Sequence, residues 1–193
     1  MLHNKMIWQE NDLRSHFHTK LEFGRTANLQ ETISVIQRGF GLSLINGAGF
    51  WLMPFDNAWY HQNDIMNNIA NIQKAANESL AVKDKSSCAQ VAFIFDEKSL
   101  DFTGIVTNNN FIDGHCWDLY QEAARTGAPF DMYLLKDIRN SKMPDYKLYI
   151  FMNTHYADKE TRDAISAKVR KNNAVTVWCY APGYVTDSGF SVD

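Results

Sequence analysis

Cysteine is scarce in this sequence, and basic residues are not in excess. The three cysteines, Cys88, Cys116 and Cys179, are odd in number and widely spaced, which fits neither a disulfide framework nor a zinc cluster. The 19 Lys and Arg residues against 22 Asp and Glu give a formal net charge of −3, whereas a nucleic-acid-binding surface needs a basic face. We therefore expect no metal, no cofactor and no nucleic-acid partner.

Long apolar runs are missing as well. No run approaches the roughly 20 residues that a membrane-spanning helix needs, so we expect no membrane partner. The N-terminal residues lack the apolar core of a signal peptide. The localisation stays open, cytoplasmic or exported. If the chain is a piece of a longer protein, as we expect below, a signal peptide could lie upstream of its first residue.

Aromatic residues, by contrast, are abundant. They make up 13% of the chain, within an apolar fraction of 45% and a charged fraction of 21% that are ordinary for a folded domain. Several stand beside polar residues, and Tyr or Trp with a wet edge is common where sugars stack. The pattern indicates either an aromatic-rich core or a surface for amphipathic ligands, and the sequence leaves both open.

Apolar runs and helical apolar periods alternate on both sides of a short charged segment, Lys83–Ser87, which we interpret as a linker. Asn28 and Asp158 are typical N-caps, and Asn46-Gly47 is a typical helix end. We expect strands at 5–9, 49–55, 90–95, 130–135, 145–152 and 174–180, and helices at 29–46, 65–80, 113–126 and 158–172.

This alternation predicts an α/β fold with parallel strands joined by right-handed crossovers. Residues 88–193 are expected to form a small, doubly wound sheet with the strand order 2-1-3-4. Residues 1–82 offer only two strands and two helices, which can neither close a barrel nor cover both faces of a sheet. We therefore expect this part to be the last piece of something larger, and both ends of the chain to be cut.

Particular motifs sharpen this interpretation. Met6–Glu10 is an apolar run that ends in a glutamate, and Asn46–Phe55 joins a helix end to a strand rich in Phe and Trp. In this order they resemble the seventh and eighth strands of the (β/α)8 barrel of glycoside hydrolase family 42, the β-galactosidase-like enzymes. The second half of the chain carries the likeness in Gly127–Asp131, Leu134-Leu135 and Pro144–Tyr149.

The resemblance implies an identity for each part. Residues 1–82 would be the last two βα units of a TIM-type barrel, an incomplete C-terminal part of the glycosidase. Residues 88–193 would be a C-terminally incomplete β-galactosidase trimerisation domain, with a flavodoxin-like or class I glutamine amidotransferase-like fold. It also implies a homo-oligomer, such as a trimer, built through the second part.

The implied activity is retaining hydrolysis of O-glycosidic bonds in a carbohydrate substrate, with Glu10 as the candidate nucleophile. A retaining glycosidase needs two carboxyl groups roughly 5–5.5 Å apart. The resemblance puts the acid/base residue on an earlier barrel strand that is absent here. We therefore expect a fragment of a glycoside hydrolase that is inactive by itself.

Candidate substrate-binding residues follow the two strands of the first part. Arg14 could orient a sugar hydroxyl, and His16 lies in the same loop. Trp51, Asp56 and Trp59 would combine an apolar platform with a carboxylate, as a pyranose ring requires. His16 and His18 also have the spacing of metal ligands on a strand, but no further ligand joins them, and a solvated loop is the alternative.

Two other function classes stay open. The first is a non-catalytic oligomerisation or carbohydrate-binding module. The second is an amidotransferase-like hydrolase with Cys116 as its nucleophile, in the segment Asp113–Trp117. A nucleophile elbow needs a tight small-residue turn between strand and helix, and buried structural thiols are the alternative.

Overall fold

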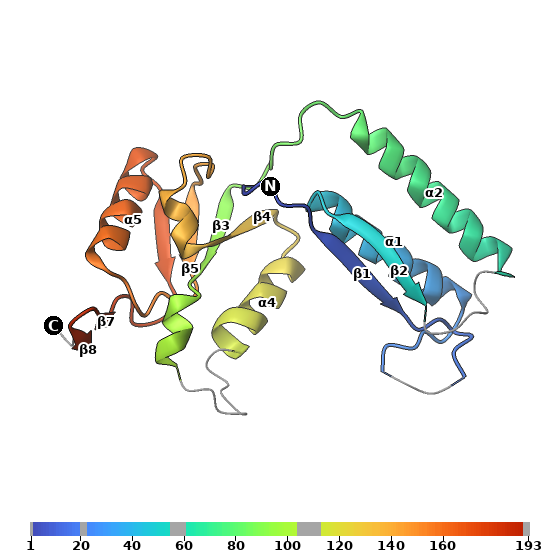
Figure 1. Cartoon of the computed structure of the whole chain (residues 1–193), viewed down its shortest axis with the longest axis horizontal. Coiled ribbons are helices and arrows are strands. Elements are labelled where there is room, and N and C mark those ends of the chain that lie inside the picture. Colours follow the sequence, from blue (N-terminus) through green and yellow to red (C-terminus); the bar gives the residue numbers. More distant parts are fainter. Residues whose placement is uncertain (1, 20–22, 55–60, 104–112, 191–193) are drawn as a thin grey trace. The chain divides into compact units, whose positions relative to one another are not determined.

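The computed structural model describes residues 2–19, 23–54, 61–103 and 113–190. The chain divides into two compact units, unit 1 at Met1–Lys85 and unit 2 at Ser86–Asp193 (Figure 1). The division falls inside Lys83–Ser87, the segment expected to be a linker. Each unit is described by itself.

Unit 1 consists of β1 (Trp8–Leu13), α1 (Leu29–Ile45), β2 (Gly49–Pro54) and α2 (Asn63–Leu80). The two strands pair in parallel, from Trp8 opposite Gly49 to Leu13 opposite Pro54. The predicted caps of α1 are confirmed. The Asn28 side chain accepts a hydrogen bond from the Glu31 amide, and Gly47 follows the helix with φ +61°, which favours glycine.

The small core of unit 1 lies between the helices and one face of the sheet. Leu13, Ile36 and Ile65 are fully buried there, and Leu52 packs against them. Apolar residues at helical spacing predict inward faces that run to Leu44 on α1 and to Leu80 on α2, and this prediction is partly wrong. Leu44 on α1 and Leu80 on α2 are exposed, and α1 instead buries Thr32 and Ser43. The reason is that α1 lies on polar side chains of β1 and its loop.

Unit 2 is built on a four-stranded parallel sheet in the order β4-β3-β5-β6. In chain order this is 2-1-3-4, so the predicted α/β class and strand order are confirmed. Its elements are β3 (Val91–Phe95), η2 (Lys98–Phe102), η3 (Asp113–Asp118), α4 (Leu119–Arg125), β4 (Phe130–Leu134), η4 (Leu135–Arg139), β5 (Leu148–Phe151), α5 (Lys159–Lys171), β6 (Val175–Trp178), β7 (Val185–Thr186) and β8 (Gly189–Phe190).

Helices cover both faces of this sheet. Figure 1 shows α4 and α5 on opposite sides of it. The Tyr120 ring of α4 lies 5.9 Å from Phe130 on one face, and η4 contacts α5. The core of unit 2 is larger than that of unit 1. Its buried apolar side chains include Ala92, Phe93, Ile94, Leu135, Ile138, Tyr149, Phe151, Met152 and Ile165.

Three local expectations need correction. The first strand was placed at 5–9, but β1 begins at Trp8 and ends at Leu13, because pairing with β2 defines it and the apolar Met6 and Ile7 are exposed. The helix at 113–126 begins with a turn of π-helix, η3. The last strand ends at Trp178, so Cys179 lies just beyond it, with its amide bonded to the Phe151 carbonyl.

Candidate functional site

One face of β1 is turned toward α1. The Ser43 hydroxyl donates to Oε1 of Gln9 at 2.8 Å. A Cβ added to Gly39 of α1 would lie 2.7 Å from Nδ2 of Asn11, so glycine permits the close approach. Since side chains alternate along a strand, Trp8, Glu10 and Asp12 point away from the helix, and all three are exposed.

The same alternation holds in β2. Phe50 points toward α1, where its ring meets Phe40 at 6.2 Å. Trp51 and Met53 therefore lie on the opposite face, 42% and 37% exposed. Glu10 is the register partner of Trp51, and partners in a parallel pair share a face. Glu10 and Trp51 thus stand side by side on a sheet face that α1 does not cover, called the open face here.

The position of Glu10 differs from the expectation. It was placed at the end of a strand, as in a barrel active site, but β1 continues to Leu13 and Glu10 is its third residue. The role of Glu10 as a nucleophile stays a prediction. Trp8 also belongs to the open face and was missed. Because side chains alternate along a strand, the position of Trp8 two residues before Glu10 was the signal that could have placed it on the same face.

The loop after β1 is tied to α1. Nδ1 of His16 lies 2.8 Å from the Thr32 hydroxyl oxygen, and Arg25 donates to the backbone carbonyls of His16 and His18 at 3.0 and 2.7 Å. His16 therefore positions the loop, and its role in substrate binding stays a prediction. Arg14 lies 3.9 Å from the Asp12 carboxylate, at the edge of the open face.

Other predicted site residues are not brought together. Asp56 and Trp59 lie outside the described residues, so the expected platform is represented by Trp51 alone. In the part of the chain that the structure describes, no group of three or more His, Cys, Asp or Glu side chains could hold a metal ion. No helix there is both long and apolar enough to cross a membrane.

A concave feature lies in unit 2, at the carboxyl ends of the strands. It is a cavity of about 480 Å³, called the edge cavity here. Its walls are formed by the three chain segments that follow β3, β4 and β5. It is lined by Asp96, Glu97, Lys98, Asp101, Leu134, Leu135, Lys136, Arg139, Tyr156, Asp158 and Thr161.

Buried hydrogen bonds lock the segments behind the edge cavity. Oδ1 of Asn153 accepts from the Asp96 amide, and Nδ2 of Asn153 donates to the Asp96 carbonyl, both at 2.8 Å. The Ser99 hydroxyl donates to Asp96 and accepts from the amides of His155 and Tyr156 at 3.0 and 2.9 Å. The loops after β3 and β5 are thereby fixed to each other.

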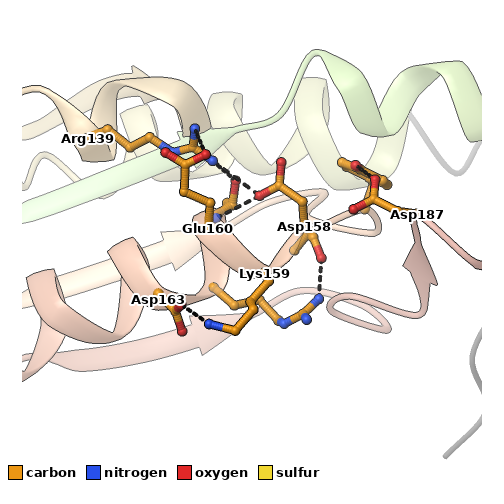
Figure 2. A network of polar contacts seen from close by, with 10 residues as sticks. Arg139, Asp158, Lys159, Glu160, Asp163 and Asp187 are labelled. Carbon is orange, nitrogen blue, oxygen red and sulfur yellow. Dashed lines mark hydrogen bonds and ion pairs between the residues drawn. The ribbon is translucent and has the colours of Figure 1, made fainter.

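Charged side chains at the N-terminus of α5 form a second network (Figure 2). Arg139 donates to Asp158 at 3.2 Å and to the Thr161 hydroxyl at 2.6 Å, and its other terminal nitrogen lies 3.2 Å from Glu160. Hydrogen bonds from Thr161, helped by the charge of Arg139, lower the pKa of Asp158. Asp158 caps α5 as the sequence predicted, and Arg139 joins that cap to η4.

The cysteine hypothesis loses support from the surroundings of Cys116. Burial, with a smaller contribution from the nearby Cys179, raises the pKa of the Cys116 thiol to about 11. A cysteine nucleophile reacts as the thiolate and needs a lowered pKa. The described surroundings therefore favour the alternative of structural thiols.

Comparisons with known proteins give a structural likeness and no match of sequence. No family model matches the chain, and no curated protein matches it significantly. The chain is similar to a solved β-galactosidase from Bifidobacterium adolescentis, with 17% sequence identity and a TM-score of 0.42. The match covers 55% of this chain and 46% of that enzyme's chain, so the chain spans less than half of the enzyme. A likeness of this size assigns neither a family nor an activity.

Proposed function

We propose that the chain belongs to a glycoside-hydrolase-type protein, in which the open face of unit 1 contacts a carbohydrate. The observation that carries the proposal is the pairing of Glu10 with Trp51 on the side of the sheet opposite α1. In a (β/α)8 barrel, helices surround the strands and the opposite strand face points to the interior. In the proposed parent, the open face would lie on that interior side.

The chemistry of the open face suits a sugar ring. An indole offers a flat apolar surface for a pyranose face, and Trp51 is exposed enough to provide one. Carboxylates accept hydrogen bonds from hydroxyl groups, which gives Glu10 and Asp12 their proposed roles. As the nucleophile of a retaining mechanism, Glu10 needs a second carboxyl group roughly 5–5.5 Å away, which we propose an earlier strand of the parent supplies.

Finer parts of the proposal rest on the motif resemblance alone. They are a β-galactosidase of family 42 as the parent, unit 1 as the end of its barrel, and unit 2 as its trimerisation domain. The single chain would then be inactive. Incubation with chromogenic galactosides and glucosides should give no turnover above that of Glu10→Gln, and any turnover that depends on Glu10 would contradict the fragment hypothesis.

Sugar binding is tested on the full chain by ¹H–¹⁵N spectroscopy. Galactose and lactose should shift the amides of Glu10 and Trp51, and Trp51→Ala should abolish these shifts because the stacking surface is gone. Trp117→Ala is the matched control, since Trp117 is 62% exposed in unit 2. Unchanged β1 and β2 amides at saturating sugar, or equal shifts in Trp51→Ala, would overturn the proposal.

A non-catalytic oligomerisation module is the second candidate. It is favoured by β6, an edge strand of its sheet with Val175 62% and Val177 44% exposed. Exposed apolar edges associate unless they are covered. Light scattering at micromolar concentration should then show an oligomer that Val177→Lys disrupts. A monodisperse 22.1 kDa species would exclude this candidate for the chain.

A further inference from the structure

The edge cavity lies where the connections of the sheet diverge. The chain leaves β3 toward α4 and leaves the neighbouring β5 toward α5, and these two helices cover opposite faces (Figure 1). Open α/β sheets bind ligands in the crevice formed at the carboxyl ends of strands at such a switch point. The cavity volume of about 480 Å³ is also within the range typical of small-molecule sites.

The walls of the edge cavity are held in place before any ligand arrives. Asp96, Ser99 and Asn153 are more than nine-tenths buried, and their hydrogen bonds join the loops after β3 and β5. On another side, Arg139 fixes η4 to the first turn of α5 (Figure 2). A preformed site loses little free energy to ordering when it binds.

The lining mixes both signs of charge at close range. Lys136 pairs with Glu97 at 2.7 Å, and Nζ of Lys98 lies 3.9 Å from the centre of the Tyr156 ring. Asp101 is exposed, and no other described side chain pairs with its carboxylate. Four lining carboxylates face three lining cations, so the cavity has no net attraction for an anion. It offers ionic donors and acceptors side by side.

Such a lining suits a ligand whose groups both donate and accept hydrogen bonds. Each hydroxyl of a polyol both donates and accepts hydrogen bonds, so neighbouring ammonium and carboxylate groups can serve the same molecule. We propose that the edge cavity binds a small neutral polyhydroxylated ligand, a mono- or disaccharide, with Lys136 donating to it and Asp101 accepting from it. This goes beyond the proposed function, because it uses unit 2 and neither Glu10 nor Trp51.

The test uses the full chain and amide spectra with galactose, lactose and sorbitol as probes. At least one of them should shift the amides of Lys98, Lys136 and Thr161 with saturation. Asp101→Ala and Lys136→Ala should each weaken this binding about tenfold, as expected for the loss of a hydrogen bond to a charged group. The matched controls, Asp118→Ala and Lys142→Ala, should bind as the unchanged chain does.

Three outcomes would overturn the inference. The first is no shift of the cavity amides with any of the probes. The second is shifts confined to β1 and β2, which would support the open face and reject the edge cavity. The third is stronger binding of inorganic phosphate than of the sugars at the same amides. That result would mean that the site prefers anions to neutral ligands. Cavity shifts without shifts in β1 and β2 would support this inference and reject the proposed function.

Discussion

Both units contain parallel strands joined by a helix, but the helices cover the sheet differently in the two units. In unit 1 the helices cover one face of a two-stranded sheet, and the fully buried core cluster is Leu13, Ile36 and Ile65. In unit 2 the four strands have helices on both faces and bury large aromatic side chains such as Tyr149 and Phe151. Apolar burial drives folding in proportion to its area, so unit 2 should be the more stable unit.

The two units also differ in where they present polar and aromatic side chains. Unit 1 presents a flat face with Glu10 and Trp51, whereas unit 2 presents a walled cavity supported by buried hydrogen bonds. The open face is formed by one pair of strands, whereas the edge cavity takes its walls from three chain segments.

Phe151→Ala should have the largest effect on the stability of unit 2. Phe151 is 1% exposed and its ring stacks on Trp178 at 4.0 Å. Its loss removes buried apolar area and leaves a cavity, so the free energy of unfolding should fall by about 3–5 kcal/mol. Urea denaturation measures the change. Phe23→Ala, at a position 96% exposed, should change little, and equal effects of both would contradict the assigned core.

Ser99→Ala should destabilise the edge of the unit 2 sheet. The variant leaves the buried amide of Tyr156 without its acceptor and removes a donor to Asp96. The amide of His155 loses one of its two acceptors and keeps the Asn153 carbonyl. A buried group left unsatisfied costs about 1–3 kcal/mol, so we expect a loss near 2 kcal/mol in urea denaturation. Ser166→Ala on the exposed side of α5 should cause no loss. A neutral Ser99→Ala would show that the loops are not locked together.

Asp145 should make the free energy of unfolding of unit 2 depend on pH. Hydrogen bonds from Lys168 and Lys171, both at 2.8 Å, lower the pKa of Asp145 to about 2. A lowered folded-state pKa stabilises the fold above the unfolded value near 4, and this contribution is lost as the pH falls toward 2. Asp145→Asn should therefore cost about 1–2 kcal/mol at pH 7, after discounting for partial exposure.

The same variant should be nearly as stable as the unchanged chain at pH 2. Asp163→Asn is the matched control and should show a smaller difference, because Asp163 and its partner Lys159 are both mostly exposed. Thermal unfolding across pH 2–7 measures both. A difference for Asp145→Asn that does not shrink with acid would contradict the assigned ion pairs.

Two glycines of α1 test the packing of unit 1 with the smallest expected effect. A Cβ at Gly41 meets nothing within 4 Å, so Gly41→Ala should stabilise the helix by about 0.5–1 kcal/mol. A Cβ at Gly39 would crowd Asn11 and Phe50. Gly39→Ala should therefore be at least about 1 kcal/mol less stable than Gly41→Ala. Equal stabilities would mean that α1 does not pack closely on the sheet.

Much of the fold could be predicted from the sequence because local signals and burial agree. The non-alternating run Val91–Phe95 reads as a strand buried on both faces, and Asp158 reads as an N-cap. Apolar periodicity predicts the inward face of α1 only in part. Ile36 and Phe40 do lie inward, but the helix also packs through Thr32, Gly39 and Ser43. Polar and small residues do not mark an inward face in sequence.

The sites were less accessible to prediction. Glu10 and Trp51 were singled out from the sequence, but the end of β1 was misplaced because strand pairing and not apolarity sets it. The lock behind the edge cavity joins Asp96 to Asn153, which is 57 residues away. Contacts at such separation depend on the strand order and leave no local pattern.

The most direct test of the difference between the units is amide hydrogen exchange on the full chain. Exchange protection rises with the free energy of the opening that exposes each amide. We predict that amides in β3 (Val91–Phe95) and β5 (Leu148–Phe151) exchange last, and that those of β1 and β2 exchange well before them. If β1 and β2 outlast β3 and β5, unit 1 closes a core of its own, and the account of an open face would be contradicted.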